Sequence, residues 1–436
     1  MDSTLLMSVG IVLLLFLLLF SGQWIGMALA TMGVVILVFF VGRHQVAMIG
    51  ILQFNQANSF IFAAVPLFVF MGYLLIHSGL SDRIYMAVTP LVSFIPGGLL
   101  HTNVVGGAVF GACCGTSVAG AAAVGSVALP QLKKRNYDKQ LSYGSLAAGG
   151  TMSAIIPPSI AFIVYGAWVQ ESVGALFIAG ILPGVLMTAL FMGYIAIRAI
   201  RNPSVAPRER VNTRQLLWGL VDMLPIGILV LAVLGSIYAG IATPTEAAGM
   251  GGVVAIGISA SYRRLTWPVL RASILDTVKV TCMVMILVIG AQFFAIGLSM
   301  LKIPSELSAW LIALPINRYA ILGLIIVFYF VLGMFMEGAA IMLLSLPVTY
   351  PVMMGLGFSS VWFGVIVTMM IQVGLLTPPV GMDVFIIHKL SGERDMSNAI
   401  RGALPFMVLM LITALLTIIF PEIATWLPSQ MLGRAY

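Results

Sequence analysis

The chain has 436 residues, of which 61% are hydrophobic and only 8% are charged. Soluble domains carry about 25% charged residues, so this chain cannot cover a water-facing surface and a soluble fold is excluded. The net charge of +7 comes from Lys and Arg in short loops beside apolar segments. That pattern marks the cytoplasmic side of a membrane protein and not a nucleic-acid-binding module.

Apolar runs of roughly 17–25 residues, the length that crosses a bilayer core as a helix, recur along the chain. They predict an all-α polytopic membrane protein with about 10 spans plus two re-entrant hairpins. The run at 5–20 has no basic flank and no clear cleavage site, so we interpret it as the first span and not as a signal peptide. The expected full-length spans are 5–20, 24–41, 60–77, 180–200, 217–238, 247–261, 282–298 and 400–420.

Four further apolar stretches are interrupted near their middle. An unpaired backbone group costs several kcal/mol in hydrocarbon, so broken helices persist only where they line a protein-enclosed or watery cavity. The stretches and their breaks are 99–132 at Gly115-Thr116-Ser117, 141–169 at Pro157-Pro158-Ser159, 319–354 at Met336-Glu337-Gly338, and 361–388 at Thr377-Pro378-Pro379.

These breaks recur at nearly one offset, which indicates a duplicated unit. The two Pro-Pro pairs lie 221 residues apart, and the similar segments 180–183 and 402–405 lie 222 apart. Each half is expected to contain two spans, a short amphipathic arm, a span, a hairpin, a broken helix and a final span. Repeats of this kind build many secondary transporters.

The predicted repeats are 1–200 and 216–436, joined by a basic cytoplasmic linker at 201–215. The first repeat comprises scaffold spans within 5–41 and 60–77, the hairpin 99–132 and the broken helix 141–169. The second comprises scaffold spans within 217–298, the hairpin 319–354 and the broken helix 361–388.

Charge predicts that the two repeats are inverted. The loop after the first hairpin, 133–139, is strongly basic, whereas its counterpart after the second hairpin, 355–360, has no charge. Because Lys and Arg mark the cytoplasmic side, the same loop faces opposite sides in the two halves. We therefore expect a multi-pass protein of the bacterial inner membrane with both termini periplasmic.

The breaks also predict where ligands bind. A helix that begins near Val118 in mid-membrane carries about half a positive charge at its N-terminus, which suits an anionic group. The carbonyls of the arriving arm suit a small cation. The prolines end one helix and start the next. Hard hydroxyl oxygens of the kind that sodium prefers are supplied by Thr116, Ser117, Ser159 and Thr377.

Two acidic residues lie inside the broken elements, Glu337 and Asp383. Intramembrane carboxylates are costly and functional by default. Either residue could bind a cation, cap a half-helix or exchange a proton. Either could instead satisfy a helix N-terminus for structural reasons, and the sequence leaves these alternatives open.

Several stretches resemble, in order along nearly the whole chain, the large membrane subunit of tripartite ATP-independent periplasmic (TRAP) transporters. The similar stretches are 111–119, 156–160 followed by Tyr165-Gly166, 176–184, 240–248 and 374–381. Two positions depart from the family pattern. Gly338 stands where the family usually has Pro, and Asp383 where it usually has Asn or another neutral residue.

The resemblance implies a transporter and not an enzyme. It implies elevator-type uptake of an organic acid that a periplasmic binding protein delivers, with a small membrane subunit packed on the scaffold. Sodium ions would drive the uptake, and no other cofactor is implied. Consistently, the chain has no phosphate-binding G-x-x-x-x-G-K-[ST] loop.

The resemblance also implies the site residues. Sodium would bind at Gly115, Thr116, Ser117, Ser153 and Pro157 in the first half, and at Met336, Glu337, Gly338, Gly374 and Thr377 in the second. The substrate would contact Thr116, Ser117, Pro158, Ser159, Glu337, Pro379 and Asp383.

Two other functions were weighed. A stand-alone sodium/carboxylate symporter of related architecture would need no binding protein. An intramembrane serine protease would need a base within hydrogen-bond reach of Ser117. His101 begins the arm that ends there, so it lies roughly 24 Å away at about 1.5 Å per residue, and His388 ends its segment near a water boundary.

Overall fold

The computed structural model describes residues 2–42, 50, 54, 58–207 and 213–434, and within them the chain forms helices and no strands. The first half begins with α1 (Asp2–Phe20), α2 (Ile25–Ile36) and the π-helical turn η1 (Leu37–Val41). It continues with η3 (Phe60–Ala63), α4 (Ala64–His77), α5 (Leu80–Val92), α6 (Leu99–Cys114), α7 (Ser117–Lys134), α8 (Lys139–Ile155), α9 (Ile160–Val169) and α10 (Val173–Arg201).

The second half begins with α11 (Thr213–Val230), η4 (Leu231–Gly235) and α12 (Ser236–Tyr238), which continue one another. It goes on with α13 (Pro244–Ser261), α14 (Trp267–Met300), α15 (Ile303–Ala313), α16 (Arg318–Gly333), α17 (Gly338–Gly355), α18 (Ser360–Leu375), α19 (Met382–Ser391), α20 (Ser397–Ile419) and α21 (Glu422–Leu432). Each of the four expected breaks coincides with the gap between two of these helices.

Seven of the described helical segments are long and apolar enough to cross a membrane, which confirms the multi-pass, all-helical class. Shorter apolar helices accompany them, among them the arriving arms α6 and α16 of the two hairpins. The seven segments are Phe60–His77, Lys139–Val169, Val173–Arg201, Leu216–Tyr238, Trp267–Met300, Gly338–Gly355 and Ser397–Ile419.

The expected amphipathic arm of the second half is wrong in position. From Trp267 onward, the stretch between Ser261 and the predicted span 282–298 belongs instead to α14, a single helix of 34 residues. Pro268 lies in the first turn of α14, where proline is tolerated, and no helix breaker follows it. The charges of Asp276 and Lys279 interrupt the hydropathy but not the helix. The corresponding arm of the first half falls largely on 43–57, mostly outside the described residues.

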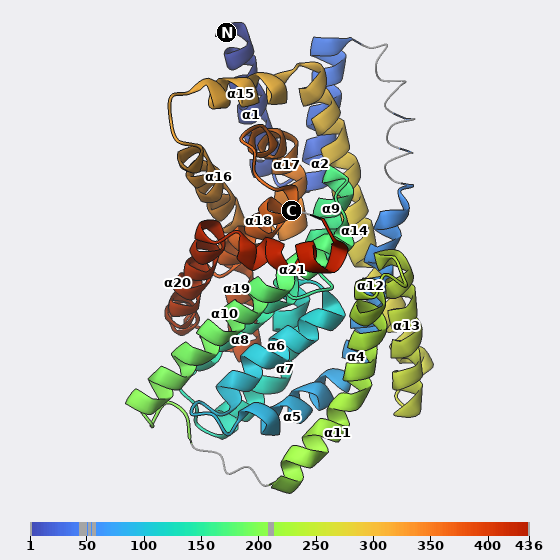
Figure 1. Cartoon of the computed structure of the whole chain (residues 1–436), viewed down its shortest axis with the longest axis vertical. Coiled ribbons are helices and arrows are strands. Elements are labelled where there is room, and N and C mark those ends of the chain that lie inside the picture. The colour runs from blue at the N-terminus through green and yellow to red at the C-terminus, as the bar shows by residue number, and fades with distance from the viewer. Residues whose placement is uncertain (1, 43–49, 51–53, 55–57, 208–212, 435–436) are drawn as a thin grey trace.

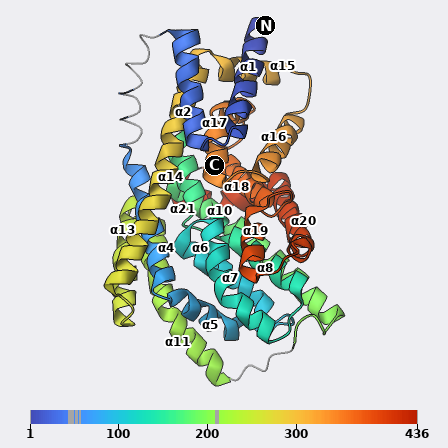
Figure 2. The same cartoon turned by 180° about the vertical axis from the view of Figure 1, so that it is seen from behind.

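Short helices instead precede each hairpin. The amphipathic helix α5 leads into α6, and α15 leads into α16. Figure 1 shows α1, α2 and α15 at one end of the long axis and α5 and α11 at the other. The view from behind in Figure 2 shows the same order, with α6, α8, α10, α18 and α19 between the two ends. The long helix α14 packs against both α2 and α4.

The hairpins and broken helices of the two halves pack reciprocally. The returning arm α7 of the first hairpin packs against α19 of the second broken helix, and the returning arm α17 packs against α9 of the first. Within each half the arriving arm crosses the first part of the broken helix at glycine. A Cβ on Gly107 would lie 2.2 Å from the Gly149 carbonyl oxygen, and one on Gly374 would lie 2.4 Å from Gly333 backbone carbon. Such contacts leave no room for side chains.

Candidate substrate and cation site

The tip of the first hairpin is docked on the first broken helix. Gly115 turns the chain with a φ of +67°, in the left-handed region that favours glycine. Its carbonyl oxygen accepts a hydrogen bond of 3.1 Å from the Ile160 N–H at the start of α9. A Cβ on Gly115 would lie 3.0 Å from the Pro158 carbonyl oxygen. The structure thus brings the predicted residues Gly115 and Pro158 together.

The serines beside this tip already have partners within the protein. Ser159 caps α9 by accepting from the Phe162 N–H at 3.4 Å, and its own hydroxyl donates to the Ala154 carbonyl at 2.6 Å. The Ser153 hydroxyl donates to the Gly107 carbonyl at 3.1 Å. Both serines are fully buried. They hold the first break together, so a ligand would have to share or replace these bonds.

The tip of the second hairpin, which includes Met336, has a carboxylate at the start of its returning arm. Glu337 caps α17, because its side chain accepts from the Ala339 N–H at 3.0 Å. Gly338 follows as the first residue of the helix. In the second broken helix, the Thr377 hydroxyl just after α18 donates to the Val373 carbonyl four residues earlier, at 2.7 Å. Of the roles open to Glu337, helix capping is therefore the one seen in this structure.

Asp383 behaves differently from Glu337. It is fully buried in the first turn of α19, yet its carboxylate bonds no backbone N–H of its own helix. Its Oδ2 accepts a hydrogen bond from the Ser117 hydroxyl in the first hairpin tip. Its Oδ1 is buried and has no hydrogen-bond partner among the described residues. The pair joins positions 266 residues apart and therefore connects the two halves of the chain.

The helices on either side of this pair run together. Gly125 of α7 lies against Ile387 and Leu390 of α19. Further along, the Lys133 ammonium donates to the Ser391 carbonyl at 2.5 Å. The N-termini of α7 and α19 therefore meet at one place, where Ser117 and Asp383 lie.

The two Pro-Pro breaks differ in exposure. Both Pro157-Pro158 and Pro378-Pro379 contain a cis peptide bond. Pro157 and Pro158 are buried under the first hairpin tip, whereas Pro379 is exposed. The second break is thus the more accessible side of the predicted substrate site.

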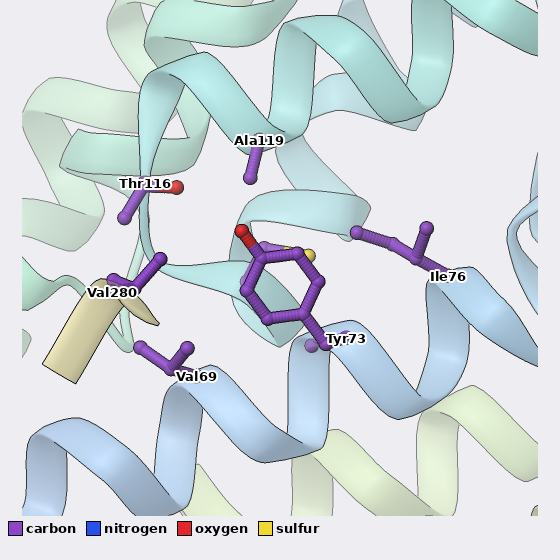
Figure 3. Close-up of a pocket in the computed structure, with 8 residues that line it drawn as sticks. Val69, Tyr73, Ile76, Thr116, Ala119 and Val280 are labelled. Atoms are coloured by element: carbon purple, nitrogen blue, oxygen red, sulfur yellow. The ribbon is translucent and has the colours of Figure 1, made fainter. Parts of the chain in front are cut away.

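A small pocket lies between the first hairpin tip and helices α4 and α14 (Figure 3). Its volume of about 20 Å³ holds roughly one water molecule. It is lined by Val69, Gly72, Tyr73, Ile76, Cys114, Thr116, Ala119 and Val280. Figure 3 shows the Tyr73 ring between Val69 and Ile76, facing the segment that carries Thr116 and Ala119. Of the predicted site residues, Thr116 is the one that lines it.

Helix α4 approaches the tip closely at Gly72. A Cβ there would lie 2.8 Å from the Cys114 Cα. Beside it, Tyr73 stacks on His77, and His77 Nε2 lies 2.9 Å from Asp276 Oδ2 of α14. This contact was not predicted from the sequence, because its residues lie in ordinary apolar runs. The signals that could have indicated it are Gly72 and Tyr73, which lie about one helical turn before His77.

The geometry disfavours a serine protease. The partner of the Ser117 hydroxyl is Asp383 and not a histidine. The His101 ring lies at the start of α6, the far end of that arm, where its Nε2 hydrogen bonds the Pro96 carbonyl at 2.9 Å. No hydrogen bond joins a serine to a histidine side chain in the described part of the chain.

Comparisons with known proteins identify the family. The model of the tripartite ATP-independent periplasmic transporter, DctM component, matches residues 12–423. The chain is 32% identical over 394 residues to the C4-dicarboxylate TRAP transporter large permease protein DctM of Pseudomonas aeruginosa, covering 89% of this chain and 90% of that one. It is 28% identical over 424 residues to the sialic acid TRAP transporter large permease protein SiaM of Vibrio cholerae, covering 94% and 98%.

A solved structure shares the fold. The YdaH transporter of Alcanivorax borkumensis superposes with a TM-score of 0.56 at 16% identity, covering 94% of this chain and 98% of that one. The match spans nearly the whole described chain, so the fold is that of a membrane transporter. With the family model covering most of its length, the chain belongs to the DctM family of large TRAP transporter permeases, which are transporters and not enzymes.

Proposed function

We propose that this chain carries out sodium-coupled uptake of an organic acid that a periplasmic binding protein delivers. The observation that supports it best is the Ser117–Asp383 bond, which brings one hairpin tip and the broken helices of both halves to one point. A site built from both halves near helix ends suits an anion and small cations together. The relatives named for C4-dicarboxylate and for sialic acid suggest a carboxylate substrate.

The reciprocal packing of α7 on α19 and of α17 on α9 supports two inverted repeats and an elevator mechanism. In this mechanism the hairpins and broken helices move as one body past the scaffold helices α2, α4, α11, α13 and α14. The contact of Gly72 with Cys114 lies on the boundary between the two bodies.

Partners follow from the same proposal. A small membrane subunit packs on the scaffold, and the binding protein docks from the periplasm, where both termini lie. Scaffold helix α11 offers apolar side chains for lipid or for that subunit, since Trp218, Leu224 and Ile228 are each more than half exposed. The membrane is the bacterial inner membrane.

The test is uptake into proteoliposomes that contain this chain and its small partner subunit. Radiolabelled succinate and radiolabelled sialic acid are each supplied with a cognate binding protein, with and without an inward sodium gradient. We expect uptake of one of them that requires both the gradient and the binding protein. Uptake that requires sodium alone would identify a stand-alone symporter, and uptake indifferent to sodium would refute the coupling.

A further inference from the structure

Two hydroxyl groups border the pocket between α4 and the first hairpin tip. Thr116 is the N-cap of α7, yet its side chain makes no capping hydrogen bond. Tyr73 of α4 lines the same pocket, and Figure 3 shows its hydroxyl turned toward the segment that carries Thr116 and Ala119. Among the described residues, neither hydroxyl has a hydrogen-bond partner. Because a polar group removed from bulk water without a partner is costly, both hydroxyls need a partner in the pocket.

The pocket suits a single water molecule. Its volume of about 20 Å³ exceeds the roughly 10–15 Å³ that one water requires. The two hydroxyls supply hydrogen-bond partners from opposite sides, whereas Val69, Ile76 and Val280 make most of the remaining lining apolar. A bridging water is enthalpically nearly as good as a direct hydrogen bond. One water can therefore join Thr116 of the hairpin to Tyr73 of α4.

The ring of Tyr73 is held in its orientation by a chain of contacts that reaches α14. The ring stacks on His77, with ring centroids 5.9 Å apart. Oδ2 of Asp276 accepts a hydrogen bond from His77 Nε2 at 2.9 Å, and Oδ1 accepts one from the Lys279 ammonium at 2.8 Å. Both carboxylate oxygens are thus engaged, so Asp276 fixes His77 and His77 supports the ring. Tyr73 is therefore oriented by α4 and α14 together.

The other side of the pocket is tied to the first broken helix. Thr116 follows Gly115, whose carbonyl oxygen accepts the Ile160 N–H. The elevator proposal assigns this tip to the moving body, and it assigns α4 and α14 to the scaffold. The two hydroxyls would then lie on opposite sides of the boundary that opens and closes in each transport cycle.

We propose that Tyr73 is a positioning residue, which holds the first hairpin tip against α4 through one water molecule shared with Thr116. The inference rests on the elevator mechanism proposed above and adds a specific contact that must break before the tip moves. A shared water suits this role, because the same hydroxyls can bond to other waters once the two surfaces separate.

The test measures how often the tip leaves α4, without measuring uptake. Cys114 is buried and lines the pocket, so we expect it to react with a small methanethiosulfonate reagent only when the tip moves away. Cys113→Ala and Cys282→Ser leave it as the one thiol, since the chain has three cysteines. The purified full-length chain is labelled with choline replacing sodium, which keeps any ion-binding role of Thr116 out of the rate.

Tyr73→Phe removes the hydroxyl and keeps the ring. We expect it to raise the labelling rate of Cys114 about fivefold, the effect of losing one net hydrogen bond. Thr116→Val removes the other hydroxyl and is expected to raise the rate by a similar factor. The double variant is expected to react no faster than either single variant, because one shared water accounts for both effects. If the two factors multiplied, the hydroxyls would act independently and the proposal would be overturned.

The matched control is Tyr238→Phe. It removes a buried hydroxyl that also has no hydrogen-bond partner among the described residues, and Tyr238 does not line the pocket. We expect this variant to label at the wild-type rate. A rise equal to that of Tyr73→Phe would indicate a general loosening of the protein and would overturn the specific contact.

The outcomes separate this proposal from the proposed function. An unchanged labelling rate in Tyr73→Phe would overturn the water-mediated contact and leave sodium-coupled uptake and the elevator mechanism standing. If wild-type Cys114 reacted only after denaturation, the tip would never leave α4, and both the contact and the elevator mechanism would be overturned. A faster rate in Tyr73→Phe that Thr116→Val does not increase further would support both.

Discussion

At the scale of single residues, the carboxylates of Glu337 and Asp383, both inside the membrane, have different roles. Glu337 bonds the backbone of its own helix, whereas Asp383 bonds a side chain from the other half of the chain. The difference follows from position. Glu337 precedes α17 as its N-cap, where a carboxylate reaches the first N–H groups, and Asp383 lies inside the first turn of α19 and points away from them.

The capping role of Glu337 predicts a stability effect that depends on the acceptor oxygen. Glu337→Ala leaves the Ala339 N–H of α17 without its partner and is expected to lower the free energy of unfolding by about 1 kcal/mol. Glu337→Gln keeps an acceptor oxygen and is expected to lose less. Thermal unfolding of the purified variants measures the order, and a Gln variant as unstable as the Ala variant would contradict it.

A second residue-scale prediction concerns the loop between α19 and α20. The Lys139 ammonium lies 2.6 Å from Glu393 Oε1, and this contact lowers the pKa of the Glu393 carboxyl. Because the folded pKa is below the unfolded value of about 4.3, the pair stabilises the loop above that value. The stabilisation disappears as the pH falls through the lowered folded pKa. Since Lys139 is 64% exposed, the effect is small and weakened by salt.

The measurement is hydrogen exchange in the loop 391–396 as a function of pH. Protection in the wild type is expected to fall as the pH drops below about 4. In Glu393→Gln it is expected to be lower at neutral pH and to lack this pH dependence. If protection depended on pH in the same way in the wild type and in Glu393→Gln, titratable groups other than Glu393 would be responsible.

At the scale of elements, aromatic packing fixes the first broken helix onto the second half. Tyr165 of α9 is fully buried and donates from its hydroxyl to the Ser360 carbonyl at 2.7 Å. Its ring packs edge-on against Tyr350 and Phe363. A Cβ on Gly364 would lie 2.7 Å from this ring. The ring of Tyr165 is therefore closely packed, with no room for a side chain at position 364.

This contact predicts graded losses of stability. Tyr165→Phe removes one hydrogen bond and is expected to cost about 1 kcal/mol, whereas Tyr165→Ala leaves a cavity and is expected to cost about 3–5 kcal/mol. Thermal unfolding in one lipid composition measures both. If the Ala variant lost no more than the Phe variant, the packing of α9 on α17 and α18 would not be the stabilising contact.

The approach of α4 to the first hairpin gives another element-scale prediction. Gly72→Ala places a Cβ 2.8 Å from the Cys114 Cα, so the two elements must separate, and both stability and uptake are expected to fall. The control is Gly193→Ala on an exposed part of α10, where nothing lies within 4 Å of the new atom. That change is expected to stabilise α10 by about 0.5–1 kcal/mol. If Gly72→Ala and Gly193→Ala had the same effect on stability and uptake, the close contact between α4 and the hairpin would be refuted.

The element boundaries were largely predictable because proline, glycine and apolar run length act locally. The four breaks and the hairpin arms followed from those signals. The continuity of α14 did not, since Arg271, Asp276 and Lys279 lower the local hydropathy without breaking the helix, and Arg and Lys favour helix. The Ser117–Asp383 bond was also out of reach. Its residues were both predicted for the site, but only the three-dimensional packing of α7 on α19 pairs them.

At the scale of the whole molecule, the elevator proposal predicts which parts move together. Gly125→Cys with Ile387→Cys places two thiols between α7 and α19, which the elevator proposal assigns to one moving body. Crosslinking them is expected to leave uptake intact. Ile76→Cys places a thiol beside the native Cys114 in the pocket between α4 and the hairpin, and crosslinking that pair is expected to abolish uptake.

Both crosslinking variants require Cys282→Ser, because Cys282 is exposed and would react. Reversal of the Ile76–Cys114 crosslink by a reducing agent should restore uptake, which separates a trapped transporter from an unfolded one. Inhibition by the α7–α19 crosslink would show that the two halves move relative to each other and would refute a single moving body.

The reciprocal packing of α7 and α19 also governs how the protein is made. The hydrogen bond of Ser117 to Asp383 cannot form until Asp383 is synthesised, 266 residues later. At roughly 5–20 residues per second, this delay lasts roughly 13–53 s. During that interval the surface of α7 that packs on α19 has no α19 to pack against. We therefore expect that slower translation, which lengthens the time before α19 is made, lowers the yield of folded permease.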